Sequence, residues 1–490
     1  MKKVLVIGSG FAGLSAACHL AAKGYDVAVV EKHNGPGGRC RVWETDGFRF
    51  DMGPSWYWMP DVFEKFFADF GKQVSDYYEL QRLDPSYRVF FSAQDIWDIP
   101  ASAEALGEML NTIEPGASQS LKKFLDEASY KYEVGIQNLV YKPGRKLSEL
   151  MDKKLISGLF KLDVFKSMSK HIDSLFKDAR IKQLLEFPVL FLGAKPQDTP
   201  ALYSLMNYAD IALGTWYPKG GMHEIVQAMY KLAQELGVKF HFNHEVKQII
   251  VEGKSARRVL TNQGEYKADL IVGGADYHHL ETLLPEHRNY SEAYWDKRVM
   301  APSSLIYYVG FSEPIPGLLH HNLFFDQDFV RHAKEIYDSP AWPENPLFYV
   351  SCTSKTDDTV APEGKENVFI LIPVAPGMKD TPEIKERYFQ LVMDRMEALL
   401  GRELRSKVEV RRDYAQSDFI SDYHSFKGNA YGLANTLMQT AHLKPSLKNK
   451  NLNNFYYTGQ LTVPGPGVPP AIISGEVVAA EIANEHPLTV

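Results

Sequence analysis

Three glycines and one acidic residue near the N-terminus have the spacing of a dinucleotide-binding site. Gly8, Gly10 and Gly13 form a G-x-G-x-x-G pattern, and Glu31 follows eighteen positions after the last glycine. In such a pattern the first glycine allows a tight turn, the second lets the backbone approach a pyrophosphate, and the third lets a helix pack closely on a strand. The acidic side chain can accept hydrogen bonds from ribose hydroxyls. This unit predicts a dinucleotide site but does not distinguish FAD from NAD.

The elements that must position these residues are also readable. Residues 4–7 are a continuous aliphatic run, which predicts a strand over 3–7 that is buried on both faces of a parallel sheet. A small-residue helix is expected over 14–22, with Gly24 ending it, and a second strand over 26–30. The uncharged stretch 4–22 after two lysines could also be a signal peptide or a membrane span. We favour strand, loop and helix, because glycines interrupt the stretch at a fixed spacing.

A second glycine pair and an arginine follow the acidic residue directly. Gly37, Gly38 and Arg39 can bring backbone amides and one guanidinium to a phosphate or to the flavin side of a cofactor. Residues 48–54 then predict a short strand that runs into a turn. The alternative is a loop that is glycine-rich without binding anything.

The pattern of strand, tight loop and helix returns near the C-terminus. Residues 454–459 predict a strand, and residues 460–470 are too rich in proline and glycine for any regular element. A small-residue helix is expected over 471–483, and its N-terminus would aim unpaired amides and a positive dipole at an anion or an electron-rich ring. Proline before a helix is equally an ordinary helix start, so this segment alone does not decide for a site.

Composition narrows the class of protein. The 490 residues are 45% hydrophobic and carry a formal charge of −7, which gives no basic field for nucleic acid. Cys18, Cys40 and Cys352 are far apart and have no metal-ligand spacing, so we expect no metal, no disulfide framework and a reducing, cytoplasmic compartment.

With these residues the chain resembles the bacterial-type phytoene desaturases, which are FAD-dependent carotenoid desaturases among the amine-oxidase-like flavoproteins. The resemblance rests on the N-terminal glycine pattern, the G-G-R that follows, and T-G-Q-L-T-V-P-G-P-G-V-P-P at 458–470. Further similar motifs are D-M-G-P-S at 51–55, W-Y-P-K-G-G-M at 216–222, A-P-E-G at 361–364 and Q-T-A with K-P within 439–445. The matches follow the family's order from residue 4 to about residue 480, and the last loop departs from the family at Leu461 and Pro470.

This resemblance implies FAD as the cofactor and an α/β fold, with a Rossmann-like FAD-binding domain and a discontinuous substrate domain of mixed sheet and helices. It places Val246 against the adenine and the backbone near Gly274 on the same face, although Val246 could also be ordinary core. The residues expected to bind FAD are Gly8, Gly10, Phe11, Ala12, Gly13, Glu31, Lys32, Gly38, Arg39, Gly53, Pro54, Ser55, Val246, Gly274, Gly459, Thr462, Gly467, Val468 and Pro469.

We expect the FAD-binding domain to comprise residues 1–90, 214–298 and 414–490. Within it, residues 238–242 predict a strand that residues 245–251 continue after a break, and residues 268–276 predict a buried strand that ends in glycines. Residues 299–413 contain strand candidates at 304–309, 347–351 and 367–372, which we expect to form the floor of a substrate cavity.

Residues 91–213 are expected to be mostly helical and to contact the membrane or the substrate. Residues 142–186 carry eleven basic and six acidic residues, with apolar residues such as Leu155, Met168 and Ile172 between lysines. This basic amphipathic pattern favours a peripheral position on an anionic bilayer, although a solvated helix that packs on the core explains it nearly as well. The candidate cavity walls are Trp56, Tyr57, Trp58, Met59 and residues 187–191, which ordinary core would match equally.

The resemblance implies hydride transfer from an allylic carbon to flavin N5 and loss of a proton from the neighbouring carbon. The expected substrate is an acyclic carotenoid, and the most favoured reaction is the conversion of phytoene toward lycopene. Quinone or oxygen is the expected electron acceptor. Glu149 is the candidate catalytic acid or base, and the adjacent His320 and His321 could supply a base or form a loop turn. The alternatives are a 3,4-desaturase of another carotenoid, a flavin-dependent isomerase, or a carotenoid-binding flavoprotein without turnover; an amine oxidase or a nicotinamide dehydrogenase fits less well.

Overall fold

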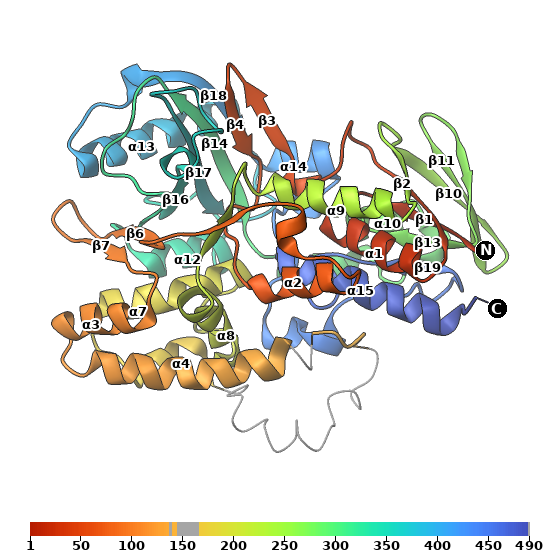
Figure 1. The fold of residues 1–490 in the computed structure, drawn as a ribbon, viewed down its shortest axis with the longest axis horizontal. Coiled ribbons are helices and arrows are strands. Elements are labelled where there is room, and N and C mark those ends of the chain that lie inside the picture. Colours follow the sequence, from red (N-terminus) through yellow and green to blue (C-terminus); the bar gives the residue numbers. More distant parts are fainter. Residues whose placement is uncertain (137–139, 145–165, 489–490) are drawn as a thin grey trace.

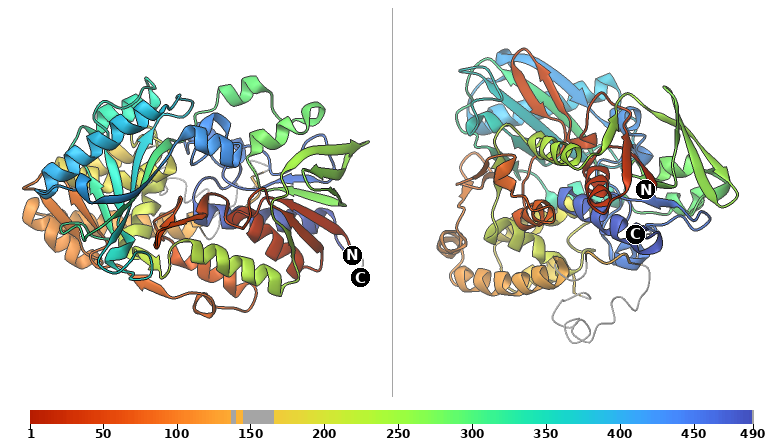
Figure 2. Two further views of the ribbon diagram at one scale, coloured as in Figure 1. Left: turned by 90° about the horizontal axis from the view of Figure 1, so that it is seen from above. Right: turned by 45° about the vertical axis from the view of Figure 1, so that its right-hand side comes forward.

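The computed structural model describes residues 1–136, 140–144 and 166–488 (Figure 1). A parallel sheet occupies one end of the molecule and a larger mixed sheet the other, while the two termini lie close together beside the parallel sheet (Figures 1 and 2). This arrangement confirms the expected α/β architecture with two sheet-based regions.

The parallel sheet has five strands, which correspond to the strands predicted within 3–7, 26–30, 238–242, 268–276 and 454–459. Strand β1 lies in its middle and pairs in parallel with β2 on one side and β13 on the other. Alternate residues of β1 face opposite layers, so Val4 and Val6 pack against helices while Leu5 and Ile7 pack on the other face. The spatial order is β19 (Phe455–Tyr457), β13 (Leu270–Gly273), β1 (Lys3–Ile7), β2 (Asp26–Val30) and β9 (Lys239–His241).

Helices cover one face of this sheet and a small antiparallel sheet covers the other. The helical layer consists of α1 (Phe11–Ala22), α9 (His223–Glu235) and α15 (Val468–Glu485). The opposite layer consists of β10 (Val246–Glu252), β11 (Ser255–Thr261), β12 (Glu265–Lys267) and α10 (Tyr277–Thr282). The prediction that 245–251 continues the preceding strand was therefore wrong: β9 ends the parallel sheet, and β10 starts a separate sheet.

The C-terminal helix begins three residues earlier than the sequence suggested. Helix α15 starts at Val468, with Pro469 and Pro470 in its first turn. Prolines fit there because the first N–H groups of a helix have no intrahelical acceptor, so nothing is lost when they are missing. The proline-rich run is thus partly helical and brings the helix N-terminus closer to the preceding glycines.

The mixed sheet has seven strands and separates two layers of core. Its longest strand, β14, is buried along its whole length; Leu305 and Tyr307 pack against α13 (Pro382–Leu400), and Ile306 and Tyr308 face the opposite side. The spatial order is β18 (Val408–Tyr414), β14 (Ser303–Phe311), β17 (Glu366–Val374), β16 (Phe348–Ser351), β15 (His321–Phe324), β6 (Tyr87–Phe90) and β7 (Ile96–Ile99). The three predicted strands of this region are confirmed.

A helical layer lies across from α13 on the other side of the mixed sheet (Figure 1). Its described helices are α3 (Ala103–Ile113), α4 (Ala117–Val134), α6 (Met168–Asp173), α7 (Ala179–Glu186) and α8 (Leu205–Asn207). Met168 and Ile172 are fully buried in this layer, so these two residues are core and do not face lipid. Leu155, like residue 149, lies outside the described residues. Among the described helices, none is long and apolar enough to cross a membrane.

The remaining elements connect the two regions. They are β3 (Val42–Thr45) and β4 (Phe48–Asp51), α2 (Pro60–Ala68), β5 (Leu80–Arg82) paired with β8 (Trp216–Pro218), α11 (Glu292–Asp296), α12 (Phe329–Tyr337) and α14 (Gln416–Tyr423).

Candidate active site

The glycine pattern forms the turn between β1 and α1 as expected. Gly8 has φ +96° and lies so close to Gly274 that a Cβ would meet the carbonyl carbon of Gly274 at 3.3 Å. A Cβ on Gly13 would lie 2.0 Å from the Gly8 oxygen, so only glycine lets the helix approach the strand. Phe11 and Ala12 open α1, whose first-turn N–H groups have no intrahelical acceptors.

Glu31 sits at the end of β2 beside this turn. One carboxylate oxygen accepts hydrogen bonds from the backbone N–H and the hydroxyl of Ser9, both at 2.8 Å, and the other accepts from the His33 N–H at 2.9 Å. Glu31 is buried, and its Oε1, which accepts only the His33 bond, keeps further acceptor capacity. The carboxylate is therefore held rigidly in a position from which it can accept hydrogen bonds from ribose hydroxyl groups.

The Gly-Gly-Arg loop brings one buried guanidinium to the same place. A Cβ on Gly53 would lie 2.3 Å from the Arg39 carbonyl oxygen, which fixes the loop against the turn after β4. Arg39 donates to the Ser425 hydroxyl at 3.0 Å and lies over the Tyr423 ring, while its Nε has no partner in the described structure. Burial lowers the pKa of Arg39. A buried guanidinium with an unsatisfied donor is suited to an anionic or strongly accepting ligand group.

The C-terminal motif meets the N-terminal one through a close helix crossing. A Cβ on Gly475 of α15 would lie 2.5 Å from the Ala12 oxygen and 2.6 Å from the Ala16 nitrogen of α1. The Ser474 hydroxyl accepts from the Gly459 N–H and the Thr458 hydroxyl, both at 3.0 Å, which ties the loop after β19 to α15. The N-termini of α1 and α15 consequently line one cavity.

This cavity has a volume of about 440 Å³, within the usual range of ligand pockets. All the predicted cofactor residues line it except Gly13 and Thr462. Gly13 acts in helix–strand packing, and the buried Thr462 hydroxyl donates to the Pro445 carbonyl at 2.6 Å, so neither reaches the cavity. Val246 lines the cavity even though it also belongs to the core behind the parallel sheet. We call the part of the cavity at Gly8, Gly10, Glu31, Val246 and Gly274 the nucleotide end.

Sequence reasoning missed several residues around the nucleotide end. His279 and His424 stack with ring centroids 4.0 Å apart, and burial followed by the neighbouring His424 lowers the pKa of His279 to about 4. His244 lines the cavity nearby. These side chains come from loops far apart in the sequence, so no local spacing could have revealed them.

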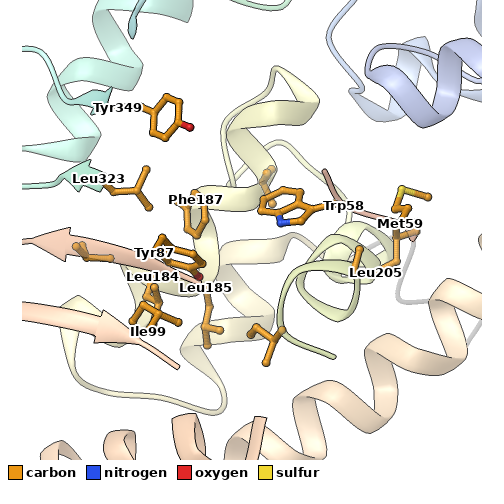
Figure 3. Packing of buried hydrophobic residues seen from close by; sticks show 14 of the residues in the cluster. Trp58, Met59, Tyr87, Ile99, Leu184, Leu185, Phe187, Leu205, Leu323 and Tyr349 are labelled. Carbon is orange, nitrogen blue, oxygen red and sulfur yellow. The ribbon is translucent and has the colours of Figure 1, made fainter. Parts of the chain in front are cut away.

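The other part of the cavity, which we call the apolar arm, runs between the mixed sheet, α12 and the helical layer. Of the predicted wall residues, Trp56, Trp58, Met59 and Phe187 line the cavity, while Tyr57 is buried away from it. Figure 3 shows Trp58, Phe187, Leu323 and Tyr349 around this region. Further apolar wall residues are Ile306, Leu323, Phe325, Phe329, Ile336 and Leu371.

A buried carboxylate supports one of these walls from behind. Asp210 accepts from the Tyr87 hydroxyl at 2.9 Å and the Thr215 hydroxyl at 3.1 Å, and Thr215 in turn accepts from the Trp58 indole N–H at 2.9 Å. Burial raises the pKa of Asp210 to about 7. The network fixes the Trp58 ring in the cavity wall.

The candidate catalytic residues are only partly placed. Residue 149 lies outside the described residues. His320 and His321 are fully enclosed and neither lines the cavity; His320 contacts the Thr356 hydroxyl at 2.6 Å and His321 contacts the Tyr349 hydroxyl at 2.6 Å. The hypothesis of a loop turn is therefore wrong for His321, which opens strand β15.

The nucleotide end fits a flavin dinucleotide. Two helix N-termini and the unsatisfied Arg39 Nε suit an anionic middle, Glu31 suits a ribose, and Val246 offers an apolar surface for a base. The apolar arm continues from the Pro54–Trp58 segment, where the other end of such a cofactor would meet a substrate.

Fold and site together define a two-region flavoprotein in which both chain ends line one cavity. Known solved structures share this fold: an oxidoreductase from Methanosarcina mazei is 18% identical with a TM-score of 0.63, covering 98% of this chain and 100% of that one. A putrescine oxidase bound to putrescine is 15% identical with a TM-score of 0.60, covering 99% of each chain.

The family described as flavin containing amine oxidoreductase matches residues 11–483. A carotenoid 3,4-desaturase from Haloarcula japonica is 40% identical over 98% of both chains. A zeta-carotene-forming phytoene desaturase from Myxococcus xanthus is 32% identical over 98% of this chain and 94% of the relative. The chain belongs to this flavin-dependent amine oxidoreductase family and, within it, to the bacterial-type carotenoid desaturases. It is an FAD-dependent oxidoreductase, as the resemblance implied.

Proposed function

We propose that this protein is a desaturase that introduces a double bond into an acyclic carotenoid. The observation that carries the proposal is the continuity of the cavity, which joins the nucleotide end directly to an arm walled by aliphatic and aromatic side chains. A polyene needs such enclosure, because it offers no polar group along most of its length. The relatives named as carotenoid desaturases support the same substrate class.

The side chains of the chain itself bind, orient and exclude water. Bound FAD would supply the hydride acceptor, and the residues expected to hold it are those of the nucleotide end together with Arg39. Trp58, fixed through Thr215 and Asp210, gives the polyene a rigid flat wall. Phe187 and Leu323 close the arm on the side of the mixed sheet and the helices.

We further propose that the new double bond is a terminal 3,4 bond of a carotenoid that is already conjugated. Identity supports this position, since the 3,4-desaturase relative is 40% identical and the phytoene desaturase relative 32% identical. Conversion of phytoene toward lycopene, which the sequence motifs favoured, is the second candidate because the latter relative also spans nearly the whole chain.

A substrate panel distinguishes these candidates. The FAD-loaded enzyme is incubated in liposomes with either lycopene or phytoene, and the extracted pigments are resolved by chromatography and absorption. Lycopene converted to a product that absorbs further to the red supports 3,4-desaturation, and coloured products from phytoene support the second candidate. An isomerase would change the retention of the pigment with little change of absorption, and a carrier would return both pigments unchanged; either result overturns the proposal.

We also propose contact with a membrane surface, from which such a substrate must enter. Met438, Leu443 and Val330 are exposed apolar residues, and Val330 is adjacent to the cavity-lining Phe329 at the start of α12. Exposed apolar side chains next to a lipid-substrate cavity are typical of interfacial contact. Flotation with anionic vesicles tests this contact: the protein should rise with the vesicles, and protein that stays in the dense fraction would contradict the proposal.

We also propose that a quinone or oxygen takes the electrons from the reduced cofactor.

A further inference from the structure

The wall of the apolar arm contains one tyrosine that is backed by a buried histidine. Tyr349 of β16 lines the cavity, and its hydroxyl lies 2.6 Å from Nδ1 of His321 on the neighbouring strand β15. The strands are antiparallel with Leu323 opposite Tyr349 and His321 opposite Ser351, so His321 and Tyr349 are diagonal neighbours on one face of the sheet. The rigid sheet therefore fixes the distance between the two groups.

His321 is placed so that it can carry a positive charge for a short time. Its ring stacks on the Trp56 indole with centroids 4.1 Å apart and planes within 11°. An aromatic face stabilises a cation, and the gain is larger in a desolvated setting. The Nε2 atom of His321 has no hydrogen-bond partner in the described structure, so no backbone group fixes the ring in one protonation state.

Other basic groups of the apolar arm are not available in this way. His332 lines the arm, but Nδ1 accepts from the Leu347 N–H at 3.1 Å and Nε2 lies 2.9 Å from the Pro373 carbonyl. A proton added to Nδ1 would break the bond to Leu347. Among the described residues that line the arm, Tyr337 offers a hydroxyl with no partner behind it.

We propose that Tyr349 is the proton acceptor of the desaturation, and that His321 takes up the tyrosine proton in turn. The inference rests on the proposed function, in which a hydride with its two electrons leaves one substrate carbon for bound FAD. The neighbouring C–H bond then breaks, and its electron pair forms the new C=C bond. The released proton goes to the Tyr349 oxygen, the original hydroxyl proton passes to Nδ1 of His321, and the product leaves as a neutral polyene.

The ordinary states of both groups suit this role. Burial raises the pKa of Tyr349, against a smaller opposite effect of the hydroxyls of Ser351 and Ser55, so the phenol stays neutral. Burial, followed by the neighbouring His320, lowers the pKa of His321 well below its usual value. Burial also lowers the pKa of His320, against a smaller opposite effect of the Asp357 carboxylate. His321 is thus neutral at physiological pH, and because burial disfavours its charged form it takes up a proton only transiently, from a strongly acidic donor such as the carbocation left by hydride loss.

Two substitutions and two matched controls test the pair in the FAD-loaded enzyme. Tyr349→Phe removes the hydroxyl, and His321→Asn keeps an acceptor near the Nδ1 position but cannot take up a proton. Tyr307→Phe removes a buried hydroxyl on the opposite face of the same sheet, where it donates to the Lys385 carbonyl at 2.6 Å, and His320→Asn changes the adjacent buried histidine, which does not line the cavity. The readouts are the anaerobic single-turnover rate at which the desaturated carotenoid forms from lycopene or phytoene, whichever the wild type desaturates, and carotenoid binding followed by flavin fluorescence quenching.

We expect the rate to fall on the order of 10²-fold in both test variants with unchanged carotenoid binding, and to stay near wild type in both controls. Test variants that match their controls would overturn the inference while leaving the proposed function intact; a wild type that reduces no flavin with either carotenoid would overturn the function itself. The dependence of the wild-type desaturation rate on pH is a further test that requires no substitution. Its acid limb should lie well below the ordinary histidine value of about 6.5, and a limb at or above that value contradicts the inference.

Discussion

Gly475→Ala is expected to weaken FAD binding although the residue does not line the cavity. Its Cβ would lie 2.5 Å from the Ala12 oxygen, 0.9 Å short of the 3.4 Å at which ordinary contact begins, and 2.6 Å from both the Ala16 nitrogen and the Ser15 Cβ. Two of these atoms are backbone of α1, so the helices must separate. Overpacking of this kind costs about 1–3 kcal/mol. Because both helix N-termini line the nucleotide end, part of that cost should appear as an FAD affinity about tenfold lower or more.

The assay is a titration of apoprotein with FAD, followed by flavin fluorescence, together with urea unfolding of the apoprotein. Gly264→Ala is the control, because a Cβ there has nothing within 4 Å. The control should match wild type in both measurements. If Gly475→Ala also matches wild type, the crossing of α1 and α15 does not position the cofactor site and the reasoning is refuted.

Two further predictions concern buried charged groups. Arg39→Ala should weaken FAD binding about 10- to 100-fold, because a buried hydrogen-bond donor is lost. The apoprotein should lose little stability, because the substitution also removes a desolvated charge. An FAD titration and a thermal melt of the apoprotein check these two results, and an unchanged FAD affinity contradicts the prediction. Asp210 has a folded-state pKa of about 7, above its unfolded value, so the folded protein binds the extra proton and stability falls as pH rises from about 4 to about 7. Asp210→Asn should remove this decline, and urea unfolding at pH 5 and pH 8 measures it; an equal decline in the variant contradicts the assignment.

The parts of the site that depend on local spacing could be predicted from the sequence. The β1 turn needs Gly8 for its positive φ and Gly13 for close packing, and these requirements stand within a few residues of one another. The same holds for Gly53 against Arg39, because the G-G-R loop and the turn after β4 are both short motifs. The two chain ends meet because each is a strand, loop and helix of one parallel sheet.

The parts of the site that depend on strand register or on distant loops could not be predicted from the sequence. The pairing of Tyr349 with His321 follows from the register of β15 and β16, which residue types alone do not fix. The stacked pair of His279 and His424 joins segments about 145 positions apart. Strand β10 was assigned to the wrong sheet for the same reason, since its composition fits either neighbour.

The central claim, that a carotenoid in the apolar arm is oxidised by FAD at the nucleotide end, is tested most directly by an anaerobic single turnover. FAD-loaded enzyme is mixed with lycopene or phytoene in liposomes while flavin absorbance is recorded, and the pigment is then extracted. We predict that the flavin bleaches and that one new double bond forms for each flavin reduced. Flavin that stays bound and oxidised, with every carotenoid recovered unchanged, would contradict the account.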